Sequence, residues 1–163
     1  MICKSFFSIL LCAIISASHA QTMQVWNWDS YKMKFKAPDN MVIIKSSGTV
    51  YEASNNKITM DIYPRKDENL TYDGMKNALV KWADDLSLSY TLNSSGESQP
   101  IYLSNLNGYW GCAIDGTKDG FSASVLLLQD PDHPEISFYI WISYAKEYYH
   151  DVVTILKSFT PIR

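Results

Sequence analysis

Two segments in the second half of the chain are apolar on both of the faces that a β-strand presents. Residues 136–142 place Ile, Phe, Ile and Ile on one face and Tyr139 and Trp141 on the other, and residues 125–128 read Val-Leu-Leu-Leu. Side chains alternate between the two faces of a strand, so a strand that is apolar on both must be covered on both. We therefore expect these two strands in the middle of a sheet with a packed layer on either side.

Two amphipathic helices are available to form those layers. Their apolar stripes have the same four-three-four spacing and are Met75, Leu79, Trp82 and Leu86, and Tyr148, Val152, Ile155 and Phe159. This spacing follows the 3.6-residue period of a helix. Thr71 is the expected N-cap of the first helix, and the second is expected over 145–159 with Pro161 after its end. The economical arrangement places one helix on each face of the sheet.

The remaining strands are expected from alternating patterns separated by turn residues. The expected ranges are 31–36, 41–45, 49–53, 58–63, 101–103 and 109–114, and the segment 125–128 belongs to a strand expected over 121–129. Pro38 and Pro64 are expected to end strands, and 115–120 is expected to be a hairpin loop. The lysines that alternate through 32–36 are typical of the solvent side of an edge strand. Short connections favour a largely antiparallel sheet, so the predicted fold class is α+β: about six to seven strands flanked by two helices in an α/β/α sandwich.

This order of elements resembles a known fold group. The marks are an opening strand 31–35 followed by Ala37-Pro38, a strand that starts at Gly108-Tyr109-Trp110, and a final helix that ends in 156–159, Leu-Lys-Ser-Phe. The chain is similar over nearly all of residues 21–163 to the PsbP, Mog and DcrB-type proteins. The resemblance implies a PsbP-like fold used by non-enzymatic proteins that bind partners or assist larger assemblies. The resemblance assigns no functional residue to this chain.

The N-terminal residues have the pattern of a secretory signal peptide. Lys4 precedes an apolar run over 5–15, and small residues at Ser18 and Ala20 fit a signal peptidase site. The run is too short to span a bilayer, which takes about 20 residues. We expect a signal peptide over 1–20 and one globular domain over 21–163, with no membrane span in the mature chain and a periplasmic or secreted location.

The net charge argues against a nucleic-acid partner, and the cysteine content argues against an internal disulfide. The formal net charge is −3, and a nucleic-acid-binding domain would be basic. Cys3 and Cys12 would leave with the signal peptide, so the mature chain would hold Cys112 alone and no internal disulfide. Cys112 alternates with Trp110 and Ile114 and is expected to be a buried apolar side chain.

The densest polar cluster is the segment 130–135, Asp-Pro-Asp-His-Pro-Glu. Asp130, Asp132 and His133 form a possible metal site, because carboxylates and imidazole ligate cations. A metal-assisted hydrolase would use Asp132, His133 and Glu135. The other interpretation is a turn between two strands, which this composition also builds. We expect the turn, and no metal or other cofactor.

Catalytic motifs are absent from the sequence. It contains no Gly-x-Ser-x-Gly elbow, no His-Glu-x-x-His pair and no phosphate-binding glycine loop. His150 is expected on a solvated helix position, where its neighbour Asp151 does not face it. We expect no catalytic residues and no enzyme activity.

The aromatic residues Trp26, Trp28 and Tyr31 are the expected binding residues. In an extended chain Trp26 and Trp28 point the same way, and their rings could stack on a sugar or pack on a partner protein. The alternative is that they cover the first strand of the sheet. The sequence thus predicts an exported, non-catalytic accessory or partner-binding domain of the cell envelope, with an unknown envelope protein as partner. A small-molecule or glycan-binding protein is the alternative function, followed by the metal-assisted hydrolase.

Overall fold

The computed structural model describes residues 20–91 and 101–163, with side chains from residue 105 onward in the second stretch. The expected signal peptide lies outside the described residues except for Ala20. Within the described part, strands form an eight-stranded and a three-stranded sheet, and every strand pair is antiparallel. No helix in this part is both long and apolar enough to cross a bilayer.

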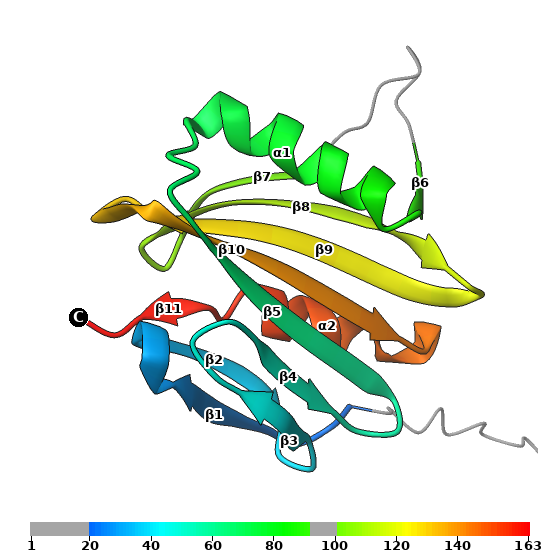
Figure 1. Cartoon of the computed structure of the whole chain (residues 1–163). Helices are drawn as coiled ribbons and strands as arrows, with labels where there is room; N and C mark the ends of the chain where they lie inside the picture. Colours follow the sequence, from blue (N-terminus) through cyan, green and yellow to red (C-terminus); the bar gives the residue numbers. More distant parts are fainter. Residues whose placement is uncertain (1–19, 92–100) are drawn as a thin grey trace, which may run out of the picture.

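The large sheet has the order β3-β4-β5-β10-β9-β8-β6, and β7 pairs with β8 (Figure 1). Its strands are β3 (Val42–Ser46), β4 (Tyr51–Ser54), β5 (Ile58–Lys66), β6 (Ser89–Tyr90), β7 (Ile101–Leu106), β8 (Tyr109–Lys118), β9 (Phe121–Asp130) and β10 (His133–Tyr144). The small sheet has the order β1-β2-β11, made by β1 (Met23–Trp28), β2 (Met33–Pro38) and β11 (Thr160–Pro161). The helical elements are η1 (Asp29–Tyr31), α1 (Tyr72–Asp85), η2 (Lys146–Tyr148) and α2 (Tyr149–Leu156).

The two strands that are apolar on both faces lie where the sequence predicts them. β10 lies between β5 and β9, and β9 lies between β10 and β8. Val125 through Leu128 are fully buried, as are Ile140 and Ile142. Burial of a Leu or Ile side chain contributes about 1.5–3 kcal/mol, so these strands form the centre of the core.

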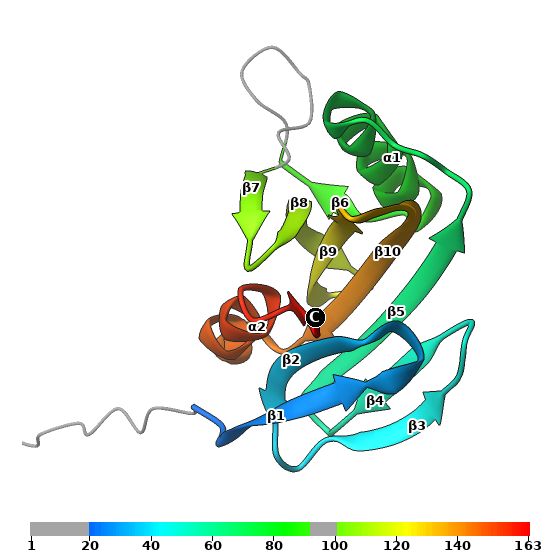
Figure 2. The ribbon, with the colours of Figure 1, turned by 90° about the vertical axis from the view of Figure 1, so that its left-hand side faces the viewer.

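The two helices cover opposite faces of the large sheet, as Figure 2 shows. On one face, Leu79 and Trp82 of α1 pack with a core cluster that includes Tyr139 of β10. On the other, Ile155 of α2 belongs to a cluster with Phe138 of the same strand. The fold is therefore the predicted α+β arrangement, with the small sheet added on the α2 side.

The helix signals of the first helix are confirmed in detail. Thr71 is the N-cap, and its Oγ1 accepts a hydrogen bond of 3.1 Å from the backbone N–H of Gly74. Asp73 lies in the first turn, where its charge is favourable beside the helix dipole. Met75 and Leu79 are fully buried against the sheet.

Several expected boundaries are wrong. β2 is the middle strand of the small sheet and not an edge; Lys34 and Lys36 still point to solvent because one face of that sheet is open. β5 continues through Pro64, because β4 pairs only with residues 59–62 and a proline is tolerated where a strand lacks one neighbour. β8 continues to Lys118, so the turn is only Asp119-Gly120, both at positive φ. α2 ends at Leu156, three residues before its expected end.

Candidate functional site

A groove of about 620 Å³ lies on the α2 side of the large sheet, where η1, the β9–β10 turn and β11 meet. We call it the Arg163 groove. Its lining residues are Ser30, Tyr31, Lys32, Lys66, Tyr109, Asp130, Asp132, His133, Ile136, Phe138, Pro161, Ile162 and Arg163. The groove thus contains one of the three predicted binding aromatics and the whole predicted metal cluster, two features that are about 100 residues apart in the sequence.

The floor of the groove is aromatic. The Tyr31 and Phe138 rings meet edge-to-face with centroids 5.3 Å apart, and Tyr109 lies against Phe138 at 6.2 Å. The Tyr31 hydroxyl donates a hydrogen bond of 2.5 Å to the carbonyl of Gly48. The ring of Tyr31 is therefore held at both ends, and the floor is preformed.

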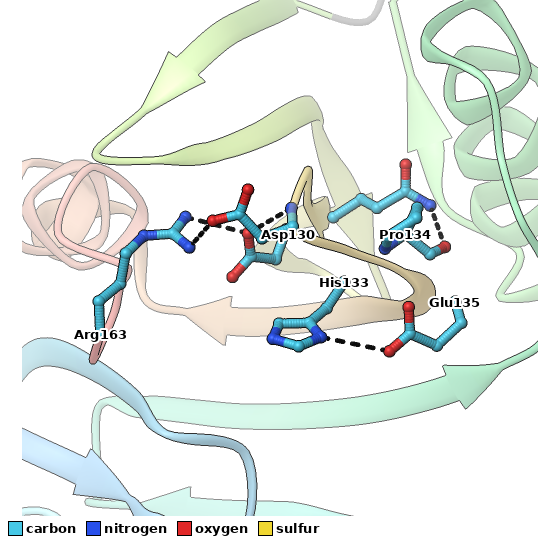
Figure 3. A network of polar contacts seen from close by, with 7 residues as sticks. Asp130, His133, Pro134, Glu135 and Arg163 are labelled. Carbon is cyan, nitrogen blue, oxygen red and sulfur yellow. Dashed lines mark hydrogen bonds and ion pairs between the residues drawn. The ribbon is translucent and has the colours of Figure 1, made fainter.

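The two aspartates of the possible metal site lie in a salt-bridged turn. Arg163 donates to Oδ1 of Asp130 at 3.0 Å and also to Oδ2 of Asp132 (Figure 3). The backbone N–H of Asp132 donates to the same Asp130 oxygen at 3.0 Å, which closes the turn. The hydrogen bond to Asp130 and the two neighbouring carboxylates raise the pKa of Arg163, so its guanidinium keeps its charge.

His133 points to a different partner. Its Nδ1 lies 3.3 Å from Oε1 of Glu135, and both side chains are exposed. Among the described residues no three His, Cys, Asp or Glu side chains are placed to hold a metal ion. The arrangement of 130–135 is that of the predicted turn, and its two aspartates hold Arg163 at the groove wall.

The groove rim is left with positive charge. Arg163 is matched by Asp130 and Asp132, whereas Lys32 and Lys66 are exposed and take part in none of the ion pairs of the described residues. Lys32 sits in the left-handed region at φ 46°, and its carbonyl accepts a hydrogen bond of 2.6 Å from the N–H of Ile162. An apolar floor with cations at the rim favours a ligand that carries apolar and anionic groups together.

The two predicted binding tryptophans are not presented as a pair of flat rings. Trp28 is only 1% exposed and packs against Tyr31 and Tyr51 in the core. Trp26 is half-buried, and its Nε1 donates to the carbonyl of Ala37 at 3.3 Å. Both residues lie on β1 of the small sheet, and Trp28 packs from there against Tyr51 and Phe138 of the large sheet, so it offers no face to a glycan.

The two-residue turn Asn107-Gly108 supports the groove wall that β11 forms. The sequence does not indicate that this turn belongs to the site. Asn107 Nδ2 donates to the carbonyls of Lys157 and Phe159 at 2.9 and 3.0 Å. Gly108, at φ +105°, lets its backbone approach Pro161 and Arg163. An Asn-Gly pair is typical of a tight turn, but no sequence pattern indicates its contact with a segment 50 residues away.

A second, smaller hollow of about 360 Å³ lies on the α1 side of the sheet. Asp61 lines it beside Trp141, and Glu52 is its cross-strand neighbour. Burial, with the charge of Glu52 second, raises the pKa of Asp61 from 3.8 to about 6. Asp61 is in none of the ion pairs of the described part of the chain.

Other residues considered for chemistry have structural surroundings. Cys112 is 1% exposed, and burial raises the pKa of its thiol to about 12, so it is the predicted apolar side chain and not a nucleophile. His150 is exposed on α2, as expected.

Comparison of the structure with solved ones identifies the fold. A Ran-binding protein of Saccharomyces cerevisiae, Mog1p, superimposes with a TM-score of 0.55 at 8% identity over 88% of this chain and 97% of its own. The chain has a Mog1-like fold. The structure of a mutant form of the protein Mog1 gives a TM-score of 0.54, also at 8% identity, over 87% of this chain and 97% of that one. No protein-family model matches the sequence, and comparison with the curated proteins finds no significant match.

Proposed function

We propose that this chain is an exported, non-catalytic domain that binds a protein partner in the cell envelope through the Arg163 groove. The observation that carries the proposal is the composition of that groove, an aromatic floor held in place by Tyr31 and Phe138 under a cationic rim. Interfaces of this kind bind through a desolvated apolar centre, while charges at the rim select the partner.

Two further observations support the proposal. The Mog1-like fold includes a protein that is described as Ran-binding, so the fold is compatible with a protein partner. The carboxylates and the imidazole that line the groove already have partners, because Asp130 and Asp132 pair with Arg163, and His133 pairs with Glu135 beside the groove. This leaves no general base beside an activated nucleophile in the groove, so binding is favoured over catalysis. The signal-peptide pattern before Gln21 supports an envelope location.

The proposal is tested by crosslinking in the living host. A photo-reactive amino acid replaces Ile162, which is exposed in the groove, and in a matched control replaces Val25, which is exposed on β1 outside it. We expect a discrete adduct with one envelope protein from position 162 and not from 25. Excess unmodified protein should compete with that adduct.

The charged rim is tested with the same probe. Lys32→Glu combined with Lys66→Glu should reduce the adduct several-fold, because both lysines lie at the rim and neither holds the fold through an ion pair. Lys45→Glu on the edge strand β3 is the matched charge control. Equal adducts from all variants, or from positions 162 and 25 alike, would contradict the proposal. Protection of position 162 by a small extract component instead of a protein would favour the small-molecule alternative.

A further inference from the structure

Two carboxylates of the described residues are almost completely buried. Asp130 and Asp151 are each 7% exposed. Asp130 has the guanidinium of Arg163 at 3.0 Å, as a buried carboxylate normally has a cation. None of the ion pairs of the described part of the chain includes Asp151. The second buried carboxylate therefore has no countercharge among residues 20–91 and 105–163.

The group that does contact Asp151 is a backbone nitrogen at a specific position. The N–H of Gln21 donates to Oδ2 of Asp151 at 3.3 Å. Gln21 is the residue that follows Ala20, the expected end of the signal peptide. A signal peptidase would hydrolyse the peptide bond between Ala20 and Gln21. The hydroxyl of a water molecule is added to the Ala20 carbonyl carbon, and its remaining hydrogen is added to the Gln21 nitrogen. The new amine then takes a proton from the Ala20 carboxylic acid and becomes an ammonium group.

We propose that Asp151 binds the α-ammonium group that cleavage after Ala20 creates at Gln21. Before cleavage the nitrogen offers one neutral N–H; after it, the same atom carries a positive charge and three hydrogens, which is the countercharge that Asp151 lacks. The inference rests on the proposed export of the chain, and it makes Asp151 a site for the product of processing.

The surroundings hold Gln21 in reach of this carboxylate. Its side-chain Oε1 accepts a hydrogen bond of 2.9 Å from Asn55, which also donates to Asn40 at 2.8 Å. The carbonyl of Thr22 accepts from the N–H of Asp39 at 2.9 Å. Figure 2 shows the start of the described chain passing close to α2 before it enters β1. The segment is tied to three other elements at the point where cleavage would free it.

The local charges fit an ammonium group. A positive charge near the start of a helix is unfavourable by itself, because the helix dipole is positive there. Asp151 lies in the first turn of α2 and reverses the local sign. Asn40 and Asn55 are neutral, and His150 is the neighbouring titratable group on α2.

The pairing has a chemical consequence. The free amine of an N-terminal glutamine attacks its own side-chain carbonyl carbon, forms a C–N bond and expels ammonia, which closes a five-membered lactam. A protonated amine has no lone pair for this attack. Asp151 should therefore keep the new α-amino group protonated and slow the closure of the lactam ring.

The experiment uses protein released from a fusion so that it begins at Gln21. Its α-amino pKa is measured by NMR, and loss of ammonia is followed by mass spectrometry. We expect an α-amino pKa clearly above the ordinary range of about 7.7–8.0. Asp151→Asn should return it to that range and accelerate ammonia loss several-fold. Asp73→Asn, in the exposed first turn of α1, is the matched control and should leave both unchanged.

A second protein, beginning at Ala20, keeps Asp151 and moves the ammonium group by one residue. Its α-amino pKa should be ordinary even if Asp151→Asn proves too unstable to measure. Identical pKa values for the proteins that begin at Gln21 and Ala20 would overturn the inference. The mass of the protein recovered from the host envelope reports separately whether the chain is exported and cut after Ala20, so failure of export and failure of the pairing are distinguishable.

Discussion

Asp61 is expected to destabilise the folded protein, so that removing its charge should raise the free energy of unfolding. It lies on β5 with Glu52 across the strand pair, and Lys118, Asp119 and Trp141 line the same hollow. Burial and the charge of Glu52 raise its pKa to about 6, and the hydrogen bond from Tyr63 offsets them only in part. The folded protein therefore binds a proton at Asp61 more tightly than the unfolded chain does.

The sign of the pH dependence follows from this difference. Below about pH 3.8, Asp61 is neutral in both states and imposes no penalty. As pH rises from about 3.8, the unfolded chain loses this proton first, so stability falls; the fall ends above about pH 6, where the folded carboxylate is ionised as well. A pKa difference of about two corresponds to about 3 kcal/mol. Because Asp61 remains partly open to solvent, screening reduces the expected penalty to about 1 kcal/mol.

The perturbation is Asp61→Asn, which keeps the size and the acceptor oxygen and removes the charge. Urea unfolding should show a gain of about 1 kcal/mol at pH 8 and no gain at pH 4. Glu52→Gln should give a smaller gain in the same direction, and Asp39→Asn on an exposed turn should give none. Equal effects of Asp61→Asn at both pH values, or a loss at pH 8, would refute the electrostatic reasoning.

Two further predictions concern the thiol and the β11 wall. Cys112 should react with a thiol reagent only as fast as the protein unfolds, because its thiol is buried and its pKa is raised to about 12; rapid labelling under native conditions would show that it is accessible. Gly108→Ala should lower the unfolding free energy by about 1–3 kcal/mol, because its φ is +105° and the added Cβ would lie 3.3 Å from Pro161. Gly120→Ala is the control, because Gly120 has a φ of +84° and an added Cβ there would meet nothing within 4 Å, so it measures the cost of the backbone conformation alone. An equal loss of unfolding free energy in both variants would show that the Pro161 contact does not contribute.

The large sheet was predictable because its signals are local. The doubly apolar segments at 125–128 and 136–142 require cover on both faces, and the spacing of Met75, Leu79 and Trp82 supplies a helix for one of them. The small sheet was not predictable in the same way. β11 is only two residues long, which is too short for a periodic pattern. The sequence of β2 predicts a strand, but it does not indicate that β1 and β11 are its neighbours.

The candidate site could be predicted only in part. Tyr31 and the segment 130–135 were recognised separately, and the sequence contains no signal that they share a groove. Arg163 was missed, and it is the residue that turns Asp130 and Asp132 from a possible metal site into a salt-bridged wall. The burial of Trp28 could not be predicted from the pattern, because alternation shows which side chains share a face but not whether that face is covered.

The position of β2 also bears on when the protein can fold. β2 pairs with β1 before it in the sequence and with β11 far after it, and Ser158 accepts a hydrogen bond from the N–H of Lys36 across 122 residues. Contacts between residues so distant form late, because a long loop must close before they stabilise anything. The third strand of the small sheet and the groove wall that it forms therefore cannot be added until residues 158–161 have been synthesised. A chain that stops before Thr160 would therefore lack this wall of the groove, even if its large sheet were complete.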